Sequence, residues 1–253
     1  MPPRVATTKP GPPPYDQLVL IGEKCLSFVH KNAKKGNPQS VVAAIDTFGY
    51  EHHWMMNVGD VKGEILDEEL EKVKPKILVE LGGHLGYSAL RFASKMRELS
   101  GPSAHVCSFE ISPDFAAIAT NMIEFAGLSD MVTIIVGTYG DNYNKLKEQD
   151  VDQVDAFFID HDKKLYKSDL AIIERSGLLR SVRDFDDMWI LVKAADVFCI
   201  QGSIVMADNV VFADVNDYLE YVRAHPQFKS MCRESYHEYS DLKDAIEIST
   251  YME

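Results

Sequence analysis

Several acidic and amide side chains stand where apolar runs of this sequence end, and a lysine follows closely behind one of them. The run DAFFID ends in Asp160, and SIVMAD ends in Asp208, which Asn209 follows. Such oxygen donors suit Mg²⁺, which needs few protein ligands because it retains water or substrate oxygens. Lys163 comes three residues after Asp160, where it could take a proton from a hydroxyl acidified by the metal. Alternatively, Asp208 and Asn209 only cap the segment that follows them.

A second group of candidate residues surrounds a glycine-rich turn. In VELGGHLGYS, Glu80 ends an apolar run and is followed by Gly82 and Gly86. Glycine lets the backbone approach a ligand closely, but the turn lacks the GxGxxG pattern of nicotinamide enzymes, and Glu80 would repel a phosphate. An acidic turn suits a cationic cofactor such as S-adenosylmethionine, whose ribose hydroxyls Glu110 could bind at the end of the next apolar run. Alternatively, the glycines only reverse the chain.

Positioning these residues together requires a sheet whose strands end at one edge. Predicted strands cover residues 76–81, 105–110, 132–137, 155–160 and 203–208. Predicted helices cover residues 64–73, 143–147 and 168–177, begin at Ser88 and Pro113, and include two or three more in the N-terminal part from Tyr15. This alternation predicts an α/β fold with a parallel sheet covered on both faces, in which ligands bind at the carboxyl ends of the strands.

Composition favours a soluble protein that acts on a small molecule. The chain has 253 residues, of which 46% are hydrophobic, and a formal net charge of −13. This charge argues against nucleic acid or an anionic membrane as partner, and no apolar run is long enough to span a bilayer. The four cysteines show no CxxC spacing, so we expect neither zinc nor disulfides and infer a reducing, cytoplasmic compartment. We also expect the protein to be a monomer. Residues 1–14 lack the features of a signal peptide and are predicted as a disordered tail before a single domain over residues 15–253.

Five stretches resemble the catechol O-methyltransferase family, and they occur in the family's order. They are HWMMNVGDVKGEILD (53–67), VELGGHLGYSALR (79–91), FAGLSDMVTIIVG (125–137), IDHDKKLY (159–166) and ADNVV (207–211). The resemblance covers roughly Phe28 to the C-terminus with one interruption. It implies a Rossmann-like class I methyltransferase fold with a central, mostly parallel seven-stranded sheet and helices on both faces. It also implies S-adenosylmethionine and Mg²⁺ as cofactors, and a catechol as the substrate.

The resemblance also implies roles for individual residues, matched by their positions in these motifs. Asp160, Asp208 and Asn209 match the metal ligands, and Lys163 matches the catalytic base. The substrate positions are those of Trp54, Met56, Lys163, Asn209 and Glu238, of which Glu238 matches the carboxylate that holds the second catechol hydroxyl. The cofactor positions are those of Val58, Glu80, Gly82, Gly86, Ser88, Glu110, Ile111, Tyr139, Asp160 and His161. From the residues alone, His161 either stacks on the cofactor base or fills space.

Three residues depart from the family's pattern in these motifs. Asp162 stands where the family has a tryptophan stacked on adenine, His84 replaces a tyrosine near the cofactor, and Ala213 replaces a proline that gates the catechol slot. We expect these substitutions to affect cofactor binding and the size or planarity of the substrate more than the chemistry.

The resemblance is interrupted by 20 residues, Val182 to Gln201. GLLRS (177–181) and GSIVMADN (202–209) would join into the family's text if this segment were absent. Every Val codon begins with GT and a Gln codon can end in AG. The segment is therefore either a retained intron translated in frame or a true surface insertion or lid.

These observations predict Mg²⁺-dependent methyl transfer from S-adenosylmethionine to one hydroxyl of a catechol. Two alternatives remain: an O-methyltransferase for another phenolic or metabolite with vicinal hydroxyls, and a protein that binds S-adenosylmethionine without turnover. The second is disfavoured because clustered charges are costly to keep in a site that does nothing. A nicotinamide dehydrogenase is disfavoured by the missing GxGxxG.

Overall fold

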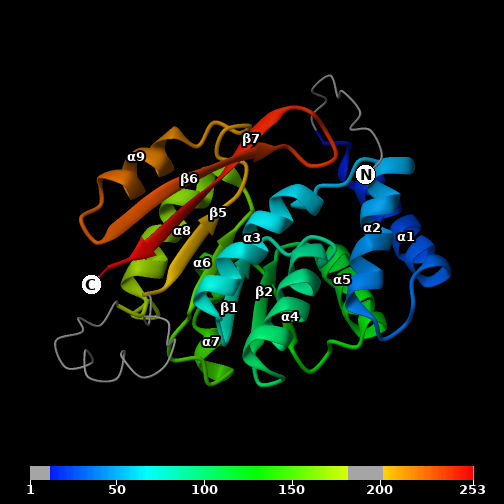
Figure 1. Ribbon diagram of the computed structural model, residues 1–253, viewed down its shortest axis with the longest axis horizontal. Helices are drawn as coiled ribbons and strands as arrows, with labels where there is room; N and C mark the ends of the chain where they lie inside the picture. The colour runs from blue at the N-terminus through cyan, green and yellow to red at the C-terminus, as the bar shows by residue number, and fades with distance from the viewer. Residues whose placement is uncertain (1–11, 182–201, 253) are drawn as a thin grey trace.

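The computed structural model describes residues 12–181 and 202–252, which build a seven-stranded sheet with helices on both sides (Figure 1). The strands lie in the order β3-β2-β1-β4-β5-β7-β6. Their bounds are β1 Ile77–Leu81, β2 His105–Glu110, β3 Val132–Val136, β4 Ala156–Ile159, β5 Ile204–Ala207, β6 Phe228–Tyr236 and β7 Lys243–Tyr251. The strands β1 to β5 pair in parallel, whereas β7 is antiparallel to both β5 and β6. The predicted mostly parallel, seven-stranded sheet is confirmed.

Helices precede β1 and connect the strands, and some of them begin at side-chain caps. Their bounds are α1 Tyr15–Asn32, α2 Pro38–Glu51, α3 Gly59–Val73, α4 Tyr87–Ser100, α5 Pro113–Ala126, α6 Tyr139–Asn142, α7 Lys145–Glu148, α8 Tyr166–Arg175 and α9 Asn216–Ala224, with a short 3₁₀ helix at Lys163–Leu165. The Asn37 side chain accepts a hydrogen bond from the backbone N–H of Ser40, and Ser112 accepts one from Phe115. A proline occupies the first helical position after each cap. Both features stabilise a helix start.

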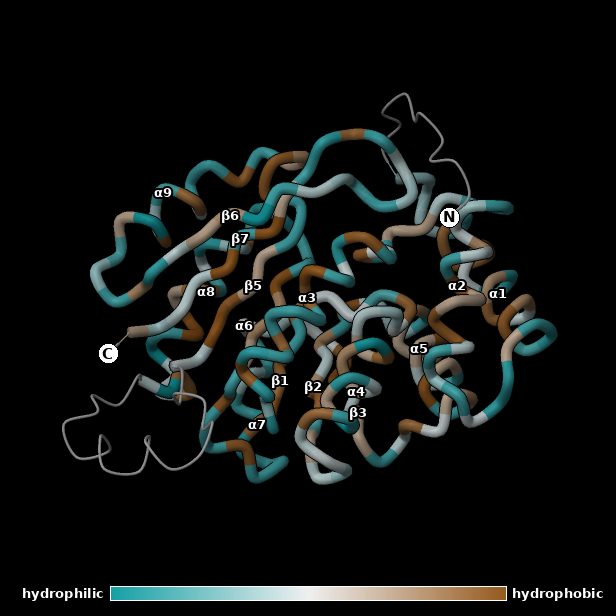
Figure 2. The backbone as a smooth tube through the Cα atoms, viewed as in Figure 1, coloured by the Kyte–Doolittle hydropathy of each residue, from teal (hydrophilic) through white to brown (hydrophobic). Residues whose placement is uncertain are grey.

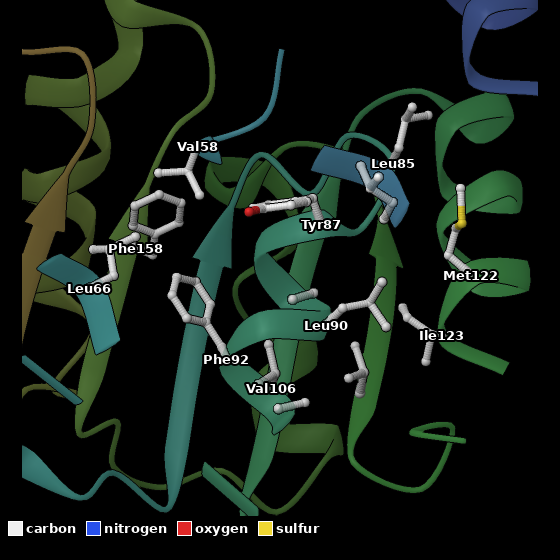
Figure 3. Packing of buried hydrophobic residues seen from close by; sticks show 14 of the residues in the cluster. Val58, Leu66, Leu85, Tyr87, Leu90, Phe92, Val106, Met122, Ile123 and Phe158 are labelled. Atoms are coloured by element: carbon white, nitrogen blue, oxygen red, sulfur yellow. The ribbon is translucent and has the colours of Figure 1, made fainter. Parts of the chain in front are cut away.

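Alternate residues of the buried strands pack into two separate hydrophobic layers. In β4, Ala156 and Phe158 face the layer covered by α1 to α5, whereas Phe157 and Ile159 face the layer covered by α6 to α9. Figure 3 shows the first layer, where Phe92 of α4 lies edge-on to Phe158 with ring centroids 5.1 Å apart. Figure 2 shows the hydrophobic course of β1 and β5 through the centre of the molecule. Both faces of the sheet are therefore covered by hydrophobic packing.

The register of the sheet brings two acidic strand ends together. Ile159 of β4 pairs with Ala207 of β5, and the backbone N–H of Asp208 donates to the Ile159 carbonyl at 3.0 Å. The backbone N–H of Asp160 likewise donates to the carbonyl of Leu81, the last residue of β1, at 2.9 Å. Parallel strands end at the same edge, so Asp160 and Asp208 follow neighbouring strands, as expected from the sequence.

Some elements differ from the predictions. A single helix over 143–147 was predicted, but this region forms the two short helices α6 and α7, and α3 begins at Gly59 rather than at residue 64. The additional turn of α3 contains Lys62. Its side chain is buried but charged, so it interrupts the apolar pattern. Apart from residues 12–14, which lead into α1, the predicted tail lies outside the described residues, as does the segment 182–201. In the described ranges, we find no helix with the length and apolarity to cross a membrane.

The chain on either side of the interrupting segment is joined by hydrogen bonds between Arg180 and Ser203. The backbone N–H of Ser203 donates to the Arg180 carbonyl at 2.8 Å, and the backbone N–H of Arg180 donates to the Ser203 hydroxyl at 2.7 Å. The same hydroxyl donates to the carbonyl of Val154, just before β4. The chain therefore leaves and re-enters the sheet at one place.

Candidate active site

A cavity of about 520 Å³ lies at the carboxyl ends of the strands. The turn after β1 contributes Gly82 to its lining, β2 ends in it with Glu110, and Asp160 and Asn209 follow β4 and β5. Glu238, in the loop between β6 and β7, also lines the cavity. Its two strands lie at the other end of the strand order from β3. This is the edge where ligands of such folds bind.

Most of the residues singled out in the sequence contribute to this lining. They are Trp54, Met56, Gly82, Glu110, Ile111, Tyr139, Asp160, His161, Lys163, Asn209 and Glu238. The others lie buried without belonging to the lining, namely Val58, Glu80, Gly86, Ser88 and Asp208. The three departures from the family pattern, His84, Asp162 and Ala213, also line the cavity. The fold thus gathers the predicted residues around one cavity. Some of them line it, and the others are buried outside its lining.

The glycine turn packs directly on the end of β4. Gly82 has φ of 101°, and a Cβ at this position would collide with the carbonyl of Asp160. Its backbone N–H donates to the Phe109 carbonyl at 2.9 Å. Glycine meets both the positive φ and the need for no Cβ. Gly82 therefore lets the turn after β1 pack against the end of β4.

Two carboxylates stand at this end of the cavity in different states. Glu80 is fully buried and accepts a hydrogen bond from Ser108, while its Oε1 has no partner among the described residues. Burial raises the pKa of Glu80 to about 7. Glu110 accepts backbone hydrogen bonds from His84 at 2.6 Å and from Ser112 at 2.7 Å. Glu80 therefore has an oxygen available for a cationic donor, and Glu110 is held rigidly by the turn.

His84 presents a neutral imidazole to the same end of the cavity. Burial lowers its pKa to about 4, and neither ring nitrogen has a hydrogen-bond partner within residues 12–181 and 202–252. The ring lies edge-on to Phe115 of α5, with centroids 4.7 Å apart. Its backbone is in the left-handed region, with φ of 43°. A buried imidazole without partners is the kind of group that a ligand or water completes.

The ends of β4 and β5 are linked by a lysine and a tyrosine. The Nζ of Lys163 lies 2.8 Å from Oδ1 of Asp160 and 2.6 Å from the hydroxyl of Tyr166. That hydroxyl donates to the backbone carbonyl of Asp208 at 3.1 Å. His161 stacks on the Tyr166 ring and contacts Asp169 at 2.8 Å, so a protein side chain already occupies one face of its ring.

A second lysine, missed in the sequence, lies beneath the cavity. The side chain of Lys62 is fully buried, and its Nζ lies 2.8 Å from Asp208, 2.9 Å from Asp244 and 3.2 Å from Glu238. Burial opposes its charge, but these carboxylates raise the pKa of Lys62 well above its ordinary value. The sequence did contain a signal, because Lys62 shares one face of α3 with buried Leu66 and Leu70 at four-residue spacing.

The donor atoms at the β4 and β5 ends fit a hard divalent cation. Asp208 Oδ1 is buried and has no partner among the described residues, and burial raises the pKa of Asp208 although Lys62 lowers it. The Asn209 amide nitrogen donates to Asp244 at 2.8 Å, which turns the amide oxygen away from Asp244.

The charges of the cluster point the same way. Its four carboxylates and two ammonium groups, when ionised, leave an excess of two negative charges; the six groups are those of Asp160, Asp208, Glu238, Asp244, Lys62 and Lys163. No group of three or more His, Cys, Asp or Glu side chains with metal-site geometry occurs within the described ranges. A site here would therefore be a sparse one of two carboxylates and an amide, as Mg²⁺ accepts.

Aromatic rings form the wall beside Glu238. His237 stacks on Trp54 with ring centroids 5.8 Å apart and an angle of 7° between the planes, and it lies 3.8 Å from the ring of Phe212. Burial lowers the pKa of His237 to about 4, and its Nε2 lies 3.1 Å from Glu238. His237 and Phe212 were not singled out in the sequence. Together these rings make an aromatic wall next to a carboxylate.

The comparisons with known proteins agree with this geometry. Residues 36–182 match the model of a family described as O-methyltransferase. The chain is 40% identical over 230 residues to the catechol O-methyltransferase of Bos taurus, covering 90% of this chain and 76% of that protein. It is 38% identical over 242 residues to that of Mus musculus, covering 94% and 82%. An O-methyltransferase from Bacillus cereus, solved in complex with SAH, aligns with a TM-score of 0.60 at 20% identity over 90% of both chains.

Proposed function

This chain belongs to the O-methyltransferase family, and we propose that it transfers the methyl group of S-adenosylmethionine to one hydroxyl of a catechol with the help of Mg²⁺. One observation carries the proposal. The pair Asp160 and Lys163, the amide of Asn209 and the carboxylate of Glu238 all line one cavity that an aromatic wall bounds. The names of the relatives in cattle and mouse support the choice of a catechol.

The cofactor would occupy the glycine-turn end of the cavity. The unpartnered oxygen of Glu80 would accept a hydrogen bond from its amino group, and Glu110 would hold its ribose hydroxyls. The remaining proposed contacts come from Val58, Gly82, Gly86, Ser88, Ile111, Tyr139, Asp160 and His161. Since a neutral His84 adds no positive charge, it does not oppose the sulfonium.

The acceptor would bind at the ends of β4 and β5. Asp160, Asp208 and Asn209 would hold Mg²⁺, which when bound supplies a positive charge that favours the ionised form of a hydroxyl. Glu238 would accept a hydrogen bond from the second hydroxyl of the catechol. Trp54 and His237 would pack against the acceptor ring, and Met56 would lie near the reacting groups.

The reaction would need a proton acceptor and a dry site. The neutral amine of Lys163 would take the hydroxyl proton, the new O–CH₃ bond would form as the S–CH₃ bond breaks, and the sulfur would keep the bonding electrons. Attack by an anion on a cation removes charge, so exclusion of water by Trp54, Phe212 and His237 would favour it.

A larger phenolic with vicinal hydroxyls is the second candidate substrate. Ala213, a small residue, lines the cavity on the acceptor side. It leaves room that a bulkier side chain would fill. The chemistry at Lys163 and Glu238 would be the same, so this candidate differs only in the ring that the cavity admits.

We further propose that the protein acts as a monomer in the cytoplasm. Its net charge of −13 disfavours self-association, and the cysteines in the described ranges are free, as in a reducing compartment. Size-exclusion chromatography at several concentrations tests the oligomeric part. A mass that corresponds to a dimer at low concentration would contradict it.

The deciding experiment is methyl transfer from S-adenosylmethionine to a simple catechol, with Mg²⁺, after chelation, and after Mg²⁺ is restored. We expect activity that chelation removes and Mg²⁺ restores. A matched phenol with a single hydroxyl is the control and should not be methylated, because it cannot use both Glu238 and the metal. Activity on larger vicinal diphenols alone would favour the second candidate. Full activity after chelation would reject the role of Mg²⁺.

A further inference from the structure

Lys62 and Asp244 form an ion pair beneath the cavity that no proposed chemical step uses. The Lys62 Nζ lies 2.9 Å from Oδ2 of Asp244, and both side chains are fully buried. They come from α3 and β7, and neither belongs to the cavity lining. Because burying two charges is expensive, such a pair often serves to fix a geometry rather than to add stability.

Asp244 holds the loop that carries Asn209. Besides Lys62, it accepts hydrogen bonds from the Asn209 amide nitrogen at 2.8 Å and from the backbone N–H groups of Phe212 at 3.0 Å and Val211 at 3.4 Å. Asn209 itself has left-handed backbone, with φ of 57°, a conformation that asparagine tolerates. Its amide is therefore fixed by both its backbone and its side chain, with the nitrogen committed to Asp244.

Lys62 acts on Asp208 in the corresponding way. Its Nζ contacts Oδ2 of Asp208 at 2.8 Å, whereas Oδ1 is buried without a partner in the described part of the chain. The same ammonium lies 3.2 Å from Oε2 of Glu238. One cation thus connects a proposed metal ligand with the carboxylate proposed to hold the substrate.

We propose that Lys62 and Asp244 are positioning residues, which determine the oxygens that Asp208 and Asn209 present to the divalent cation and hold Glu238 beside them. The inference rests on the proposed function, because it assumes a cation bound by Asp208 and Asn209. Ligands oriented in advance need no rearrangement when the cation binds, so partners of this kind increase metal affinity. Asp244→Asn should then weaken the site even though it keeps the shape of the side chain.

The test compares the binding of two probes to the same preparations. Isothermal titration calorimetry measures the affinity for Mn²⁺, which reports on the site of Asp208 and Asn209. It also measures the affinity for S-adenosylhomocysteine, which reports on the Glu80 end and on correct folding. The variants are Asp244→Asn, Lys62→Met and the two combined. Lys72→Met is the matched control, because Lys72 lies on the same helix with 46% of its side chain exposed.

We expect Asp244→Asn to weaken Mn²⁺ binding roughly 10- to 100-fold, with little change in S-adenosylhomocysteine binding. The combined variant should lose less than the product of the two single effects, because the residues act as a pair. Lys72→Met should bind both probes like the wild type. If Lys62→Met does not fold, Asp244→Asn alone decides.

Three outcomes would overturn the inference. Wild-type affinity for Mn²⁺ in folded Asp244→Asn would show that the pair does not position the ligands. An equal loss of both probes would show a role in the fold only. A wild type that binds S-adenosylhomocysteine but no Mn²⁺ would reject the metal site of the proposed function itself, and is thereby distinguished from the first two.

Discussion

The Nζ of Lys163 lies 2.8 Å from Oδ1 of Asp160, so the proposed base and the proposed metal ligand already touch. Replacing the lysine should affect the proton transfer and not the cofactor end. We expect Lys163→Met to lower kcat by about 100-fold or more, with unchanged affinity for S-adenosylhomocysteine. Lys164→Met, at an exposed neighbouring position, is the control. A kcat for Lys163→Met equal to that of the wild type would remove it as the base.

Asp208 offers a sharper test of the cation. Asp208→Ala removes the unpartnered Oδ1, so we expect methyl transfer to be abolished and Mn²⁺ binding to be lost. Calorimetry and the transfer assay measure the two effects separately. Asp217→Asn on α9 serves as a control for the loss of one negative charge, because Asp217 is exposed. A variant that still transfers methyl groups at the wild-type rate would contradict the mechanism.

Glu80 should make the cofactor affinity depend on pH. Burial raises the pKa of Glu80 to about 7, so its carboxyl is mostly protonated at pH 6 when no cofactor is bound. The cationic amino group of the cofactor prefers the ionised carboxylate. The dissociation constant for S-adenosylhomocysteine should therefore fall by up to about tenfold between pH 6 and pH 7.5. Glu80→Gln should bind more weakly and lose this dependence. The same slope in both proteins would assign the titration to another group.

Asp46 should make stability depend on pH in the opposite sense to an ordinary carboxylate. It accepts hydrogen bonds from Tyr87 at 3.1 Å and Tyr239 at 3.0 Å, and burial raises its pKa to about 6. A raised folded-state pKa favours the folded state at low pH, and this contribution is lost as pH rises through 6.

The comparison with Asp46→Asn isolates this effect. Between pH 5 and pH 7, wild type should lose roughly 1 kcal/mol of unfolding free energy relative to the variant, because the carboxyl must ionise in a buried place. Urea unfolding of both proteins at both pH values measures the difference. Altered hydrogen bonds in the variant add a constant offset that cancels. An equal difference at the two pH values would mean that Asp46 does not titrate in this range.

The strands around the site could be predicted because each is a short apolar run that ends in a polar residue. Asp160, Asp208 and Glu110 were identifiable for this reason, and the sheet brings their strand ends to one edge. β6 was not predictable in the same way. It lies at the edge of the sheet, and most of its residues, such as Lys229 and Glu234, face solvent, so it carries no apolar run.

The residues beneath the cavity escaped the sequence for a different reason. Lys62 and Asp244 lie far apart in the chain, and their types are those of ordinary surface residues. Only the pairing of β7 with β5 and the packing of α3 show that they meet. His237 was passed over because its role depends on Trp54 and Phe212, which approach it from separate loops.

Removal of residues 182–201 should leave the fold intact. Arg180 and Ser203 are hydrogen-bonded to each other, so Ser181 could be joined to Gly202 without moving β5. We expect the shortened chain to bind S-adenosylhomocysteine and to methylate catechol like the full chain, since a closed loop adds only a slowly growing entropy cost. Activity in the shortened chain alone would favour a retained intron, and a shortened chain that does not fold would contradict the prediction.

The contact between Arg180 and Ser203 also lies between two lengths of chain, each of which contributes part of the candidate active site. The part before it carries the glycine turn, Glu110, Asp160 and Lys163, whereas the part after it carries Asp208, Asn209 and Glu238. Neither part alone holds the complete set of proposed metal ligands. A protein cut at this place would therefore become a split enzyme, whose methyl transfer reports whether its two fragments have found each other.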